Sequence, residues 1–187
     1  MTTPRLQLRP WRLEDGDELY QCACDPLVGP RAGWPPHTSP ENSREIIRDI
    51  LSAPETYALV LRESGRPIGS IGLMRAGQGS APLGEDEAEL GYWLGRPYWG
   101  QGLAGEAAAA LLDHGFRDLG LKAVWCGWYE GNHQSQRVQE KCGFVYHHTE
   151  NGRVSPQMAG ERTEHFSLLT REAWLQGRQS GSKATAD

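Results

Sequence analysis

Hydrophobic and polar residues alternate along several short segments of the chain, as they do in strands with one buried face. The alternation is clearest in residues 87–94, where Leu90, Tyr92 and Leu94 fall on one face and the residues between them fall on the other. Strands are predicted at residues 5–9, 57–62, 68–74, 87–94, 123–129, 144–149 and 164–169.

Apolar residues recur every three to four positions in other segments, and this spacing predicts helices. Helices are predicted at residues 14–24, 40–53, 103–119 and 135–142, with one further helical turn at 170–174. The segment 103–119 gives the strongest signal, because it is dense in alanine and leucine and is followed by Gly120, a frequent helix-ending residue. Residues 26–36 and 76–86 are rich in turn-forming residues and are predicted as loops.

The order of these elements predicts the fold class. Residues 64–67 form a turn between two strands, which then pair antiparallel, and residues 151–152 (Asn-Gly) predict another turn between the last two strands. The helix 103–119 instead separates strands 87–94 and 123–129, and this arrangement predicts a parallel crossover. We therefore predict an α/β fold with a mixed sheet flanked by helices.

Length and composition place this fold in a single domain. The 187 residues are 38% hydrophobic and 23% charged, which suits one globular domain over residues 1–176. Residues 177–187 are small and polar, and we predict that they are disordered. No apolar run approaches the roughly 20 residues of a membrane helix, and no apolar stretch follows the first five residues. We expect a cytoplasmic location and no membrane partner.

Charge and cysteine usage exclude two further classes of partner. The net charge is -5 and no basic tract occurs, so we expect no nucleic-acid partner. The cysteines are Cys22, Cys24, Cys126 and Cys142, and none lies in a C-x-x-C pair or beside an ordered series of histidines. We therefore expect reduced thiols and no bound metal.

A glycine-rich turn joins the predicted strand 87–94 to the predicted helix 103–119. Backbone amides at the start of a helix lack internal partners, and with the helix dipole they form a site for anions. Glycines such as Gly100 and Gly102 let the backbone approach a phosphate without a Cβ atom between them. The pattern predicts a ligand that carries a phosphate or pyrophosphate group.

Three classes of phosphate ligand compete for this turn. A P-loop needs lysine and then serine or threonine, but Gln101 and Gly102 follow Gly100, which disfavours a nucleoside triphosphate. Gly100, Gly102 and Gly105 match the spacing of a dinucleotide fingerprint, and Glu130 is placed to bind a ribose. Several predicted elements precede the turn and little chain follows it, which argues against a doubly wound sheet. The third class is coenzyme A.

Residues 89–107 resemble motif A of the GNAT acetyltransferases, whose loop reads Q/R-x-x-G-x-G/A. Trp99 stands at the leading position of that loop, a departure that is typical of the RimJ/RimL branch of ribosomal-protein N-terminal acetyltransferases. A second motif follows in register: Asn132 and Ser135 resemble the family's N-x-x-S, and residues 140–144 resemble its E-K-x-G-F. The resemblance covers residues 5–174.

The resemblance implies a sheet that splays open between strands 87–94 and 123–129, with acetyl-CoA in the opening. It implies that the backbone of Trp93 and Leu94 binds the pantetheine arm and that the amides of residues 100–105 bind the pyrophosphate. The cofactor-binding residues expected on this basis are Trp93, Leu94, Trp99, Gly100, Gln101, Gly102, Leu103, Ala104, Gly105, Asn132 and Ser135.

The resemblance also suggests how the chemistry is divided among residues. Many relatives use a tyrosine as the acid, but Gln139 holds that position here. The branch instead has a glutamate and a serine, here Glu89 as the base and Ser135. Their simpler interpretations are a solvated strand residue and a helix N-cap. Trp34 and Tyr92 are the expected substrate-binding residues, although Trp34 is as well suited to packing on the core.

The resemblance predicts an N-acetyltransferase that moves an acetyl group from acetyl-CoA to a primary amine by direct attack. The leading acceptor is the N-terminal amine of a protein or peptide, and polyamines and aminoglycosides remain open as small-molecule acceptors. The alternatives from other classes are a non-catalytic acyl-CoA-binding module and a dinucleotide-dependent oxidoreductase. The branch often forms dimers, so the resemblance allows a homodimer, but the sequence does not fix the oligomeric state.

Overall fold

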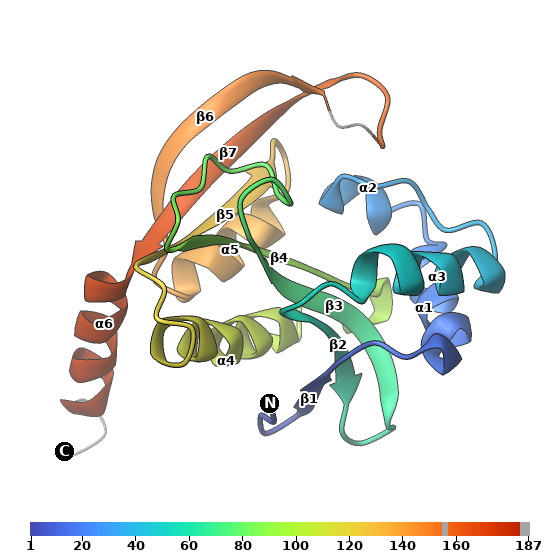
Figure 1. The fold of residues 1–187 in the computed structure, drawn as a ribbon, viewed down its shortest axis with the longest axis horizontal. Helices are drawn as coiled ribbons and strands as arrows, with labels where there is room; N and C mark the ends of the chain where they lie inside the picture. The colour runs from blue at the N-terminus through green and yellow to red at the C-terminus, as the bar shows by residue number, and fades with distance from the viewer. Residues whose placement is uncertain (155–156, 184–187) are drawn as a thin grey trace.

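The computed structural model describes residues 1–154 and 157–183 (Figure 1). The strands are β1 (Leu6–Arg9), β2 (Thr56–Leu61), β3 (Arg66–Met74), β4 (Glu87–Leu94), β5 (Ala123–Tyr129), β6 (Val145–Val154) and β7 (Glu161–Thr170). The helices are α1 (Gly16–Ala23), α2 (Gly29–Ala32), α3 (Pro40–Ile46), α4 (Leu103–Arg117), α5 (His133–Lys141) and α6 (Arg171–Lys183). Shorter helical turns are η1 (Leu13–Asp15), η2 (Ile47–Leu51) and η3 (Arg96–Tyr98).

The strands form one sheet in the order β1-β2-β3-β4-β5-β7-β6. β4 and β5 run parallel, and the other neighbouring strands run antiparallel. Helix α4 is the crossover between β4 and β5, because a parallel connection must return along the sheet. The predicted mixed α/β class is confirmed.

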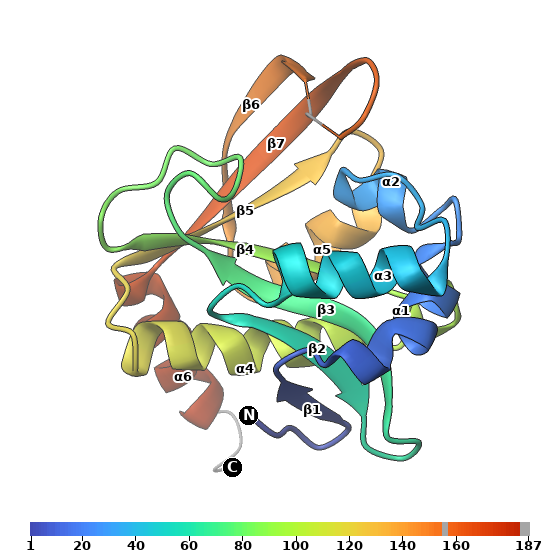
Figure 2. The same cartoon turned by 45° about the vertical axis from the view of Figure 1, so that its right-hand side comes forward.

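Hydrophobic cores lie on both faces of the sheet. The larger core packs α4 against one face and includes Leu59, Leu111 and Phe116. The smaller core packs α1 and η2 against the other face and includes Leu19 and Val60. Leu59 and Val60 are neighbours on β2, so they point to opposite faces. Figure 2 shows α4 and α3 on the two sides of the sheet.

β4 and β5 pair over a short distance only. The register joins Glu87–Glu89 to Ala123–Trp125. Beyond these residues β4 continues to Leu94 and β5 to Tyr129, but the two strands no longer pair with each other. The sheet therefore opens between these two strands, as predicted. The opening faces the glycine-rich turn, because that turn follows the end of β4.

The last hairpin differs from its prediction. Residues 151–152 were expected to form the turn between β6 and β7, but they lie within β6, which runs to Val154. The register shifts between Glu150 and Arg153, and Gly152 has a φ of 69° there. A bulge of this kind lets the strand absorb extra residues and resume pairing, so the Asn-Gly sequence does not end it.

The C-terminal segment also differs from its prediction. Helix α6 continues to Lys183, although residues from 177 onward were expected to be disordered; residues 184–187 lie outside the described part of the chain. Trp174 is buried against Phe116, with ring centroids 5.1 Å apart. The guanidinium of Arg178 lies over the Trp174 ring at 5.2 Å. This aromatic anchor explains why a polar segment is helical.

A short helix occupies part of the loop predicted at residues 26–36. Pro30 lies in the first turn of α2, where proline is favourable, and Gly33 ends the helix with a φ of 90°. None of the helices in residues 1–154 and 157–183 is both long enough and apolar enough to cross a membrane.

Candidate active site

The backbone of β4 alternates between its two neighbours near the opening. The amide of Gly95 donates to the carbonyl of Ile68 on β3 at 2.8 Å, and bonded pairs alternate in antiparallel strands. Trp93 therefore directs its backbone to β3, whereas Tyr92 and Leu94 direct theirs toward the side from which β5 has separated. The backbone groups of Tyr92 and Leu94, and not those of Trp93, therefore face the opening.

Side chains replace the strand hydrogen bonds where β4 and β5 separate. The thiol of Cys126 donates to the carbonyl of Leu90 at 3.1 Å, and the amide of Gln139 donates to the carbonyl of Gly127 at 3.1 Å. Both donors are buried. The carbonyls are thus satisfied without a partner strand, and the opening costs no unpaired group at these two positions.

The glycine turn at the start of α4 leaves open space above it. Gly100 and Gly102 have φ values of 73° and 75°, a region that glycine adopts without strain. A Cβ atom added at Gly100 or Gly105 would meet nothing within 4 Å, and one at Gly102 would meet only the Arg5 guanidinium at 3.7 Å. The unpaired amides at this helix start can therefore be approached by an anion.

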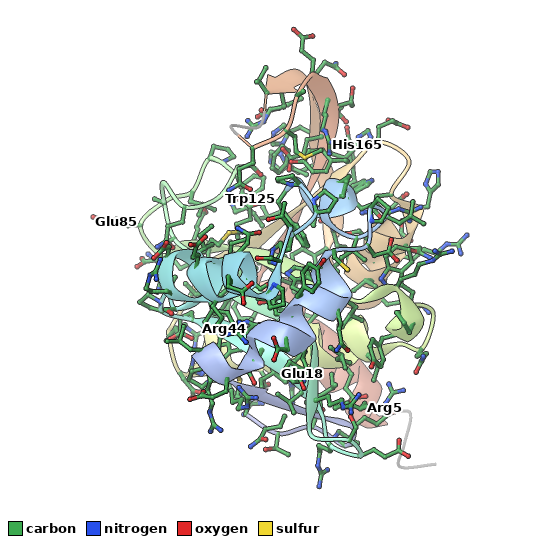
Figure 3. The ribbon with its side chains drawn as sticks, turned by 90° about the vertical axis from the view of Figure 1, so that its right-hand side faces the viewer. Arg5, Glu18, Arg44, Glu85, Trp125 and His165 are labelled. Carbon is green, nitrogen blue, oxygen red and sulfur yellow. The ribbon has the colours of Figure 1, made fainter. Side chains whose placement is uncertain are left out.

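Arg5, labelled in Figure 3, fixes the shape of this turn. Its guanidinium donates to the carbonyl of Gln101 at 2.8 Å and to the carboxylate of Glu106 at 2.7 Å. The Gln101 side chain donates to the carbonyl of Pro97 at 2.9 Å. The backbone of Gln101 is thus held from the N-terminal segment, and its side chain is committed to the turn itself.

The remaining residues predicted near the turn have different roles. The indole of Trp99 donates to the carbonyl of Leu94 at 2.7 Å, and the Arg31 guanidinium lies over the Trp99 ring at 5.1 Å. The Leu103 side chain is buried in the larger core, and Ala104 packs partly buried against it. These side chains build the turn, and only the backbone amides of Leu103 and Ala104 are suited to a ligand.

Ser135 lies opposite β4 on the first turn of α5. Its amide donates to the Asn132 side chain at 3.3 Å, so Asn132 is the N-cap of α5 and Ser135 is not. The Ser135 hydroxyl oxygen lies 3.0 Å from the hydroxyl of Tyr92 and 3.2 Å from the Gln139 amide nitrogen. Burial raises the pKa of Tyr92 well above its ordinary value, so its phenol stays protonated.

Gln139 holds several parts of the site together. Its side chain is 2% exposed, donates to Gly127 and Ser135, and accepts a hydrogen bond from the Ser167 hydroxyl at 2.5 Å. Sequence reasoning treated Gln139 only as a missing tyrosine. A buried amide whose oxygen and nitrogen both have partners instead positions the serine and the end of β5.

Glu89 is buried and fully bonded. The residue is 5% exposed. Its carboxylate accepts hydrogen bonds from the Ser80 amide at 2.6 Å, the Ala81 amide at 2.7 Å and the Ser80 hydroxyl at 3.0 Å. The interpretation of Glu89 as a solvated strand residue is therefore wrong. Sequence reasoning missed Ser80, because the loop of residues 76–86 has no periodicity that would place it over the sheet.

Aromatic side chains line the same face of β4 as Glu89. Trp93 contacts Trp34 edge to face, with ring centroids 5.3 Å apart, and Trp34 also contacts His37 at 5.2 Å. Trp34 is partly buried against the smaller core. It thus packs on the core and also lies beside Trp93, so the two roles predicted for it are compatible.

Thiols and metal-binding groups add little to this site. All four cysteines are free, and burial raises the pKa of Cys22 and Cys142 to about 11. No cluster of three or more histidine, cysteine or acidic side chains suited to a metal ion occurs in residues 1–154 and 157–183.

A cavity of about 490 Å³ lies at the closed end of the opening, away from the glycine turn. It is lined by residues of the 76–86 loop and by Leu119 and Leu121. None of the residues predicted for the site lines it.

Comparisons with known proteins identify relatives of this sequence. The sequence profile of the acetyltransferase (GNAT) domain matches residues 5–145. The chain is 33% identical over 127 residues to the uncharacterized N-acetyltransferase p20 of Bacillus licheniformis, a match that covers 65% of this chain and 68% of that protein.

Solved structures share the fold over nearly the whole chain. An acetyltransferase (GNAT family) from Bacillus anthracis has a TM-score of 0.79 at 22% identity and covers 92% of this chain and 98% of its own. A ribosomal-protein-alanine acetyltransferase from Vibrio fischeri has a TM-score of 0.72 at 16% identity, with 93% and 97% covered. A spermidine N-acetyltransferase from Vibrio cholerae, in complex with CoA and spermine, has a TM-score of 0.74 at 16% identity, with 91% and 98% covered.

Proposed function

Because the chain belongs to the acetyltransferase (GNAT) family, we propose that it transfers the acetyl group of acetyl-CoA to a primary amine by direct attack. The observation that carries this proposal is the separation of β4 from β5 directly before the glycine turn of α4. The separation frees strand backbone for an amide-containing arm, and the helix start offers amides to a pyrophosphate. A dinucleotide fold would need several adjacent parallel strands, which this sheet order does not provide.

Acetyl-CoA would lie along the opening. Tyr92 and Leu94 would bind the pantetheine arm through their backbone groups, and the amides of residues 100–105 would bind the pyrophosphate. Asn132 would border the opening from the β5 side, because it caps α5 directly after that strand. Arg5 supports the turn beside Gly102, and its charge is paired with the carboxylate of Glu106.

The reaction needs one proton acceptor and one donor. An ammonium group must lose a proton before its nitrogen attacks the thioester carbon, and Glu89 is the proposed base, directly or through one water. The carbon–sulfur bond then breaks and its electron pair leaves with the sulfur. Ser135 is the proposed donor to that sulfur, held by the protonated phenol of Tyr92 and by Gln139.

The leading acceptor is the N-terminal amine of a protein or peptide, as the branch resemblance implies. A small amine is the second candidate, since structural neighbours include both a ribosomal-protein-alanine acetyltransferase and a spermidine acetyltransferase. The buried carboxylate of Glu89, on the same face of β4 as Trp93, suits a cationic amine in either case. A cytoplasmic location and a homodimer stay predictions.

The proposal is tested by ligand-dependent melting and by coenzyme A release. We expect acetyl-CoA to raise the melting temperature and NAD and ATP to leave it unchanged, because a ligand that binds only the native state stabilises it. A panel of peptides, polyamines and aminoglycosides then identifies the acceptor by the free thiol that it releases. Stabilisation by NAD and not by acetyl-CoA would refute the cofactor assignment. Stabilisation by acetyl-CoA without thiol release from any amine would favour a non-catalytic binding module.

A further inference from the structure

Two buried carboxylates from distant parts of the chain meet at one serine. Glu89 on β4 and Glu164 on β7 are each 5% exposed, and the Ser80 hydroxyl lies 3.0 Å from one carboxylate oxygen of each. Glu164 also lies over β5, because a Cβ atom added at Gly127 would be 2.7 Å from its carboxylate. Glu89 is the last residue of β4 that pairs with β5. The two carboxylates therefore flank the point where the strands separate.

The hydrogen atoms available at this serine fix how the carboxylates share protons. A serine hydroxyl carries one hydrogen and can donate to one of the two carboxylates only. The amides of Ser80 and Ala81 also donate to Glu89, so its carboxylate acts as an acceptor toward this loop. The contact between Ser80 and Glu164 then requires a hydrogen from Glu164. The geometry describes a chain in which protonated Glu164 donates to Ser80 and Ser80 donates to ionised Glu89.

Some of the groups around Glu164 raise its pKa and others lower it. Burial is the main cause that raises the pKa of Glu164, and the nearby carboxylates of Glu89 and Glu150 add to it. The hydrogen bond with Ser80 lowers that pKa. Arg153 lowers it too, since its guanidinium lies 3.4 Å from Glu164, but Arg153 also binds Glu150 at 2.5 Å and the carbonyl of Ser80 at 2.9 Å. The result is a raised pKa for Glu164.

Two further groups approach this face of the sheet. The phenol of Tyr129 on β5 lies under the Arg162 guanidinium, which is 5.0 Å above the ring. Arg162 also donates to the carbonyl of Pro30 at 2.6 Å, so it is engaged by β5 and by α2. Burial is the main cause that raises the pKa of Tyr129, which keeps it neutral. These groups leave Arg153 as the cation in contact with Glu164 among residues 1–154 and 157–183.

We propose that Glu164 is a positioning residue for acetyl transfer: through Ser80 it holds the one proton that keeps Glu89 ionised and aimed at the acceptor amine. This inference rests on the proposed function, in which Glu89 takes a proton from the acceptor ammonium. The freed nitrogen then forms its bond to the thioester carbon, and the sulfur leaves with the electron pair of the carbon–sulfur bond. The sulfur takes the proton of the Ser135 hydroxyl, the second amine proton restores that hydroxyl, and the proton on Glu89 returns to solvent.

The first test compares Glu164→Gln with Glu164→Ala on an accepted amine. The glutamine amide can donate to Ser80 as a protonated carboxyl does, so at a pH below the pKa of wild-type Glu164 we expect turnover close to that of the wild type. Alanine removes the donor, and turnover should fall by about tenfold or more, the worth of one hydrogen bond to a charged group, with the KM for acetyl-CoA unchanged. As the pH rises, wild-type Glu164 loses its proton and the glutamine does not. The ratio of Glu164→Gln to wild-type turnover should therefore increase with pH.

Two outcomes of this test would overturn the proposal. If Glu164→Gln at a pH below the pKa of wild-type Glu164 is as impaired as Glu164→Ala, then the charge of Glu164 matters and its proton does not. If Glu164→Ala turns over like the wild type, Glu164 has no part in the reaction. Should Glu164→Ala fail to melt cooperatively, Ser80→Ala replaces it, because that variant breaks the same chain at its middle member and must lower turnover in the same way.

The second test does not need activity. Carbon-13 NMR titration of the glutamate carboxyl groups should show Glu164 titrating above the ordinary value of about 4.3. In Glu89→Gln the pKa of Glu164 should fall, because a neighbouring negative charge has been removed. An ordinary pKa for Glu164 in the wild type would refute the shared proton even in an active enzyme. A raised pKa together with no acetylation of any amine would instead refute the proposed function and leave the shared proton standing.

Discussion

At the scale of single residues, the sequence predicts which face of a strand a side chain occupies but not which groups surround it. The alternation of β4 places Glu89 on the face of Trp93, and that much follows from the sequence. Its three hydrogen bonds do not, because Ser80 and Ala81 come from a loop that is brought over the sheet by tertiary packing. Ser135 shows the same division, since the motif identified the residue but not that Asn132 caps the helix.

Glu89→Gln tests the base directly. The substitution keeps the shape of the side chain and removes its ability to take a proton, while its amide oxygen can still accept from the loop. We expect acetyl-CoA binding to persist and turnover at about pH 7 to fall by roughly two to four orders of magnitude, the usual worth of general-base catalysis. The loss should shrink at higher pH, where more of the acceptor amine is already neutral. Turnover by coenzyme A release and binding by melting shift measure the two effects.

Glu85→Gln is the matched control, because Glu85 is exposed in the same loop region and lies at the edge of the molecule in Figure 3. It should turn over like the wild type. Ser135→Ala should cost less than Glu89→Gln, since a thiolate leaves readily without a donor. Nearly wild-type turnover of Glu89→Gln at about pH 7 would make the carboxylate structural and assign proton removal elsewhere.

At the scale of elements, the sequence predicted those with a strong internal pattern. The alternation of β4 and the alanine-rich α4 have such patterns, and both elements lie within a few residues of their predicted bounds. The misses depended on contacts between distant segments. β6 runs through an Asn-Gly pair because β7 pairs with it on both sides of a bulge. α6 is helical because Trp174 packs on α4, and no local signal reports that contact.

Gly102→Val tests the glycine turn as a phosphate site. Valine must adopt a φ of 75° there, which costs roughly 1–2 kcal/mol of stability. Its side chain would also occupy the open space above the helix start, so the ligand would lose hydrogen bonds to the amides. Loss of even one such charged bond lowers affinity by about tenfold or more. Calorimetric titration with acetyl-CoA measures the affinity, and urea unfolding measures the stability.

Gly65→Val separates strain from ligand loss. Gly65 has a φ of 69° and also has nothing within 4 Å of an added Cβ atom, but it lies in the turn between β2 and β3. It should lose about as much stability as Gly102→Val and bind acetyl-CoA normally. Unchanged affinity of Gly102→Val would show that the pyrophosphate binds elsewhere.

At the scale of the whole molecule, the order of elements predicted a mixed sheet with one parallel crossover, and the family resemblance added its opening. Neither could predict how the loops close over the two faces. His37 illustrates this: it is 8% exposed beneath the loop that carries Trp34, and its ring nitrogen lies 2.8 Å from the Ser43 hydroxyl. Burial lowers the pKa of His37 to about 4 from an ordinary value of 6.5.

The buried histidine predicts how the stability of the fold depends on pH. The native state favours neutral His37, so the contribution of His37 to the free energy of unfolding is fully present above the unfolded pKa of 6.5. This contribution declines as the pH falls from 6.5 toward about 4, because in that range the unfolded chain binds a proton at His37 and the native chain does not. The loss should reach up to about 3 kcal/mol of unfolding free energy. His37→Asn keeps a polar partner for Ser43 and cannot titrate. The unfolding free energy of this variant, whatever its absolute value, should therefore fall less steeply over that range in urea titrations.

His133→Asn is the control, because His133 is exposed on α5. This variant should show the same pH slope as the wild type. Equal slopes for the wild type and His37→Asn would mean that His37 is protonated in the native state as readily as in the unfolded chain, and the loop over it would then have to admit water at acid pH.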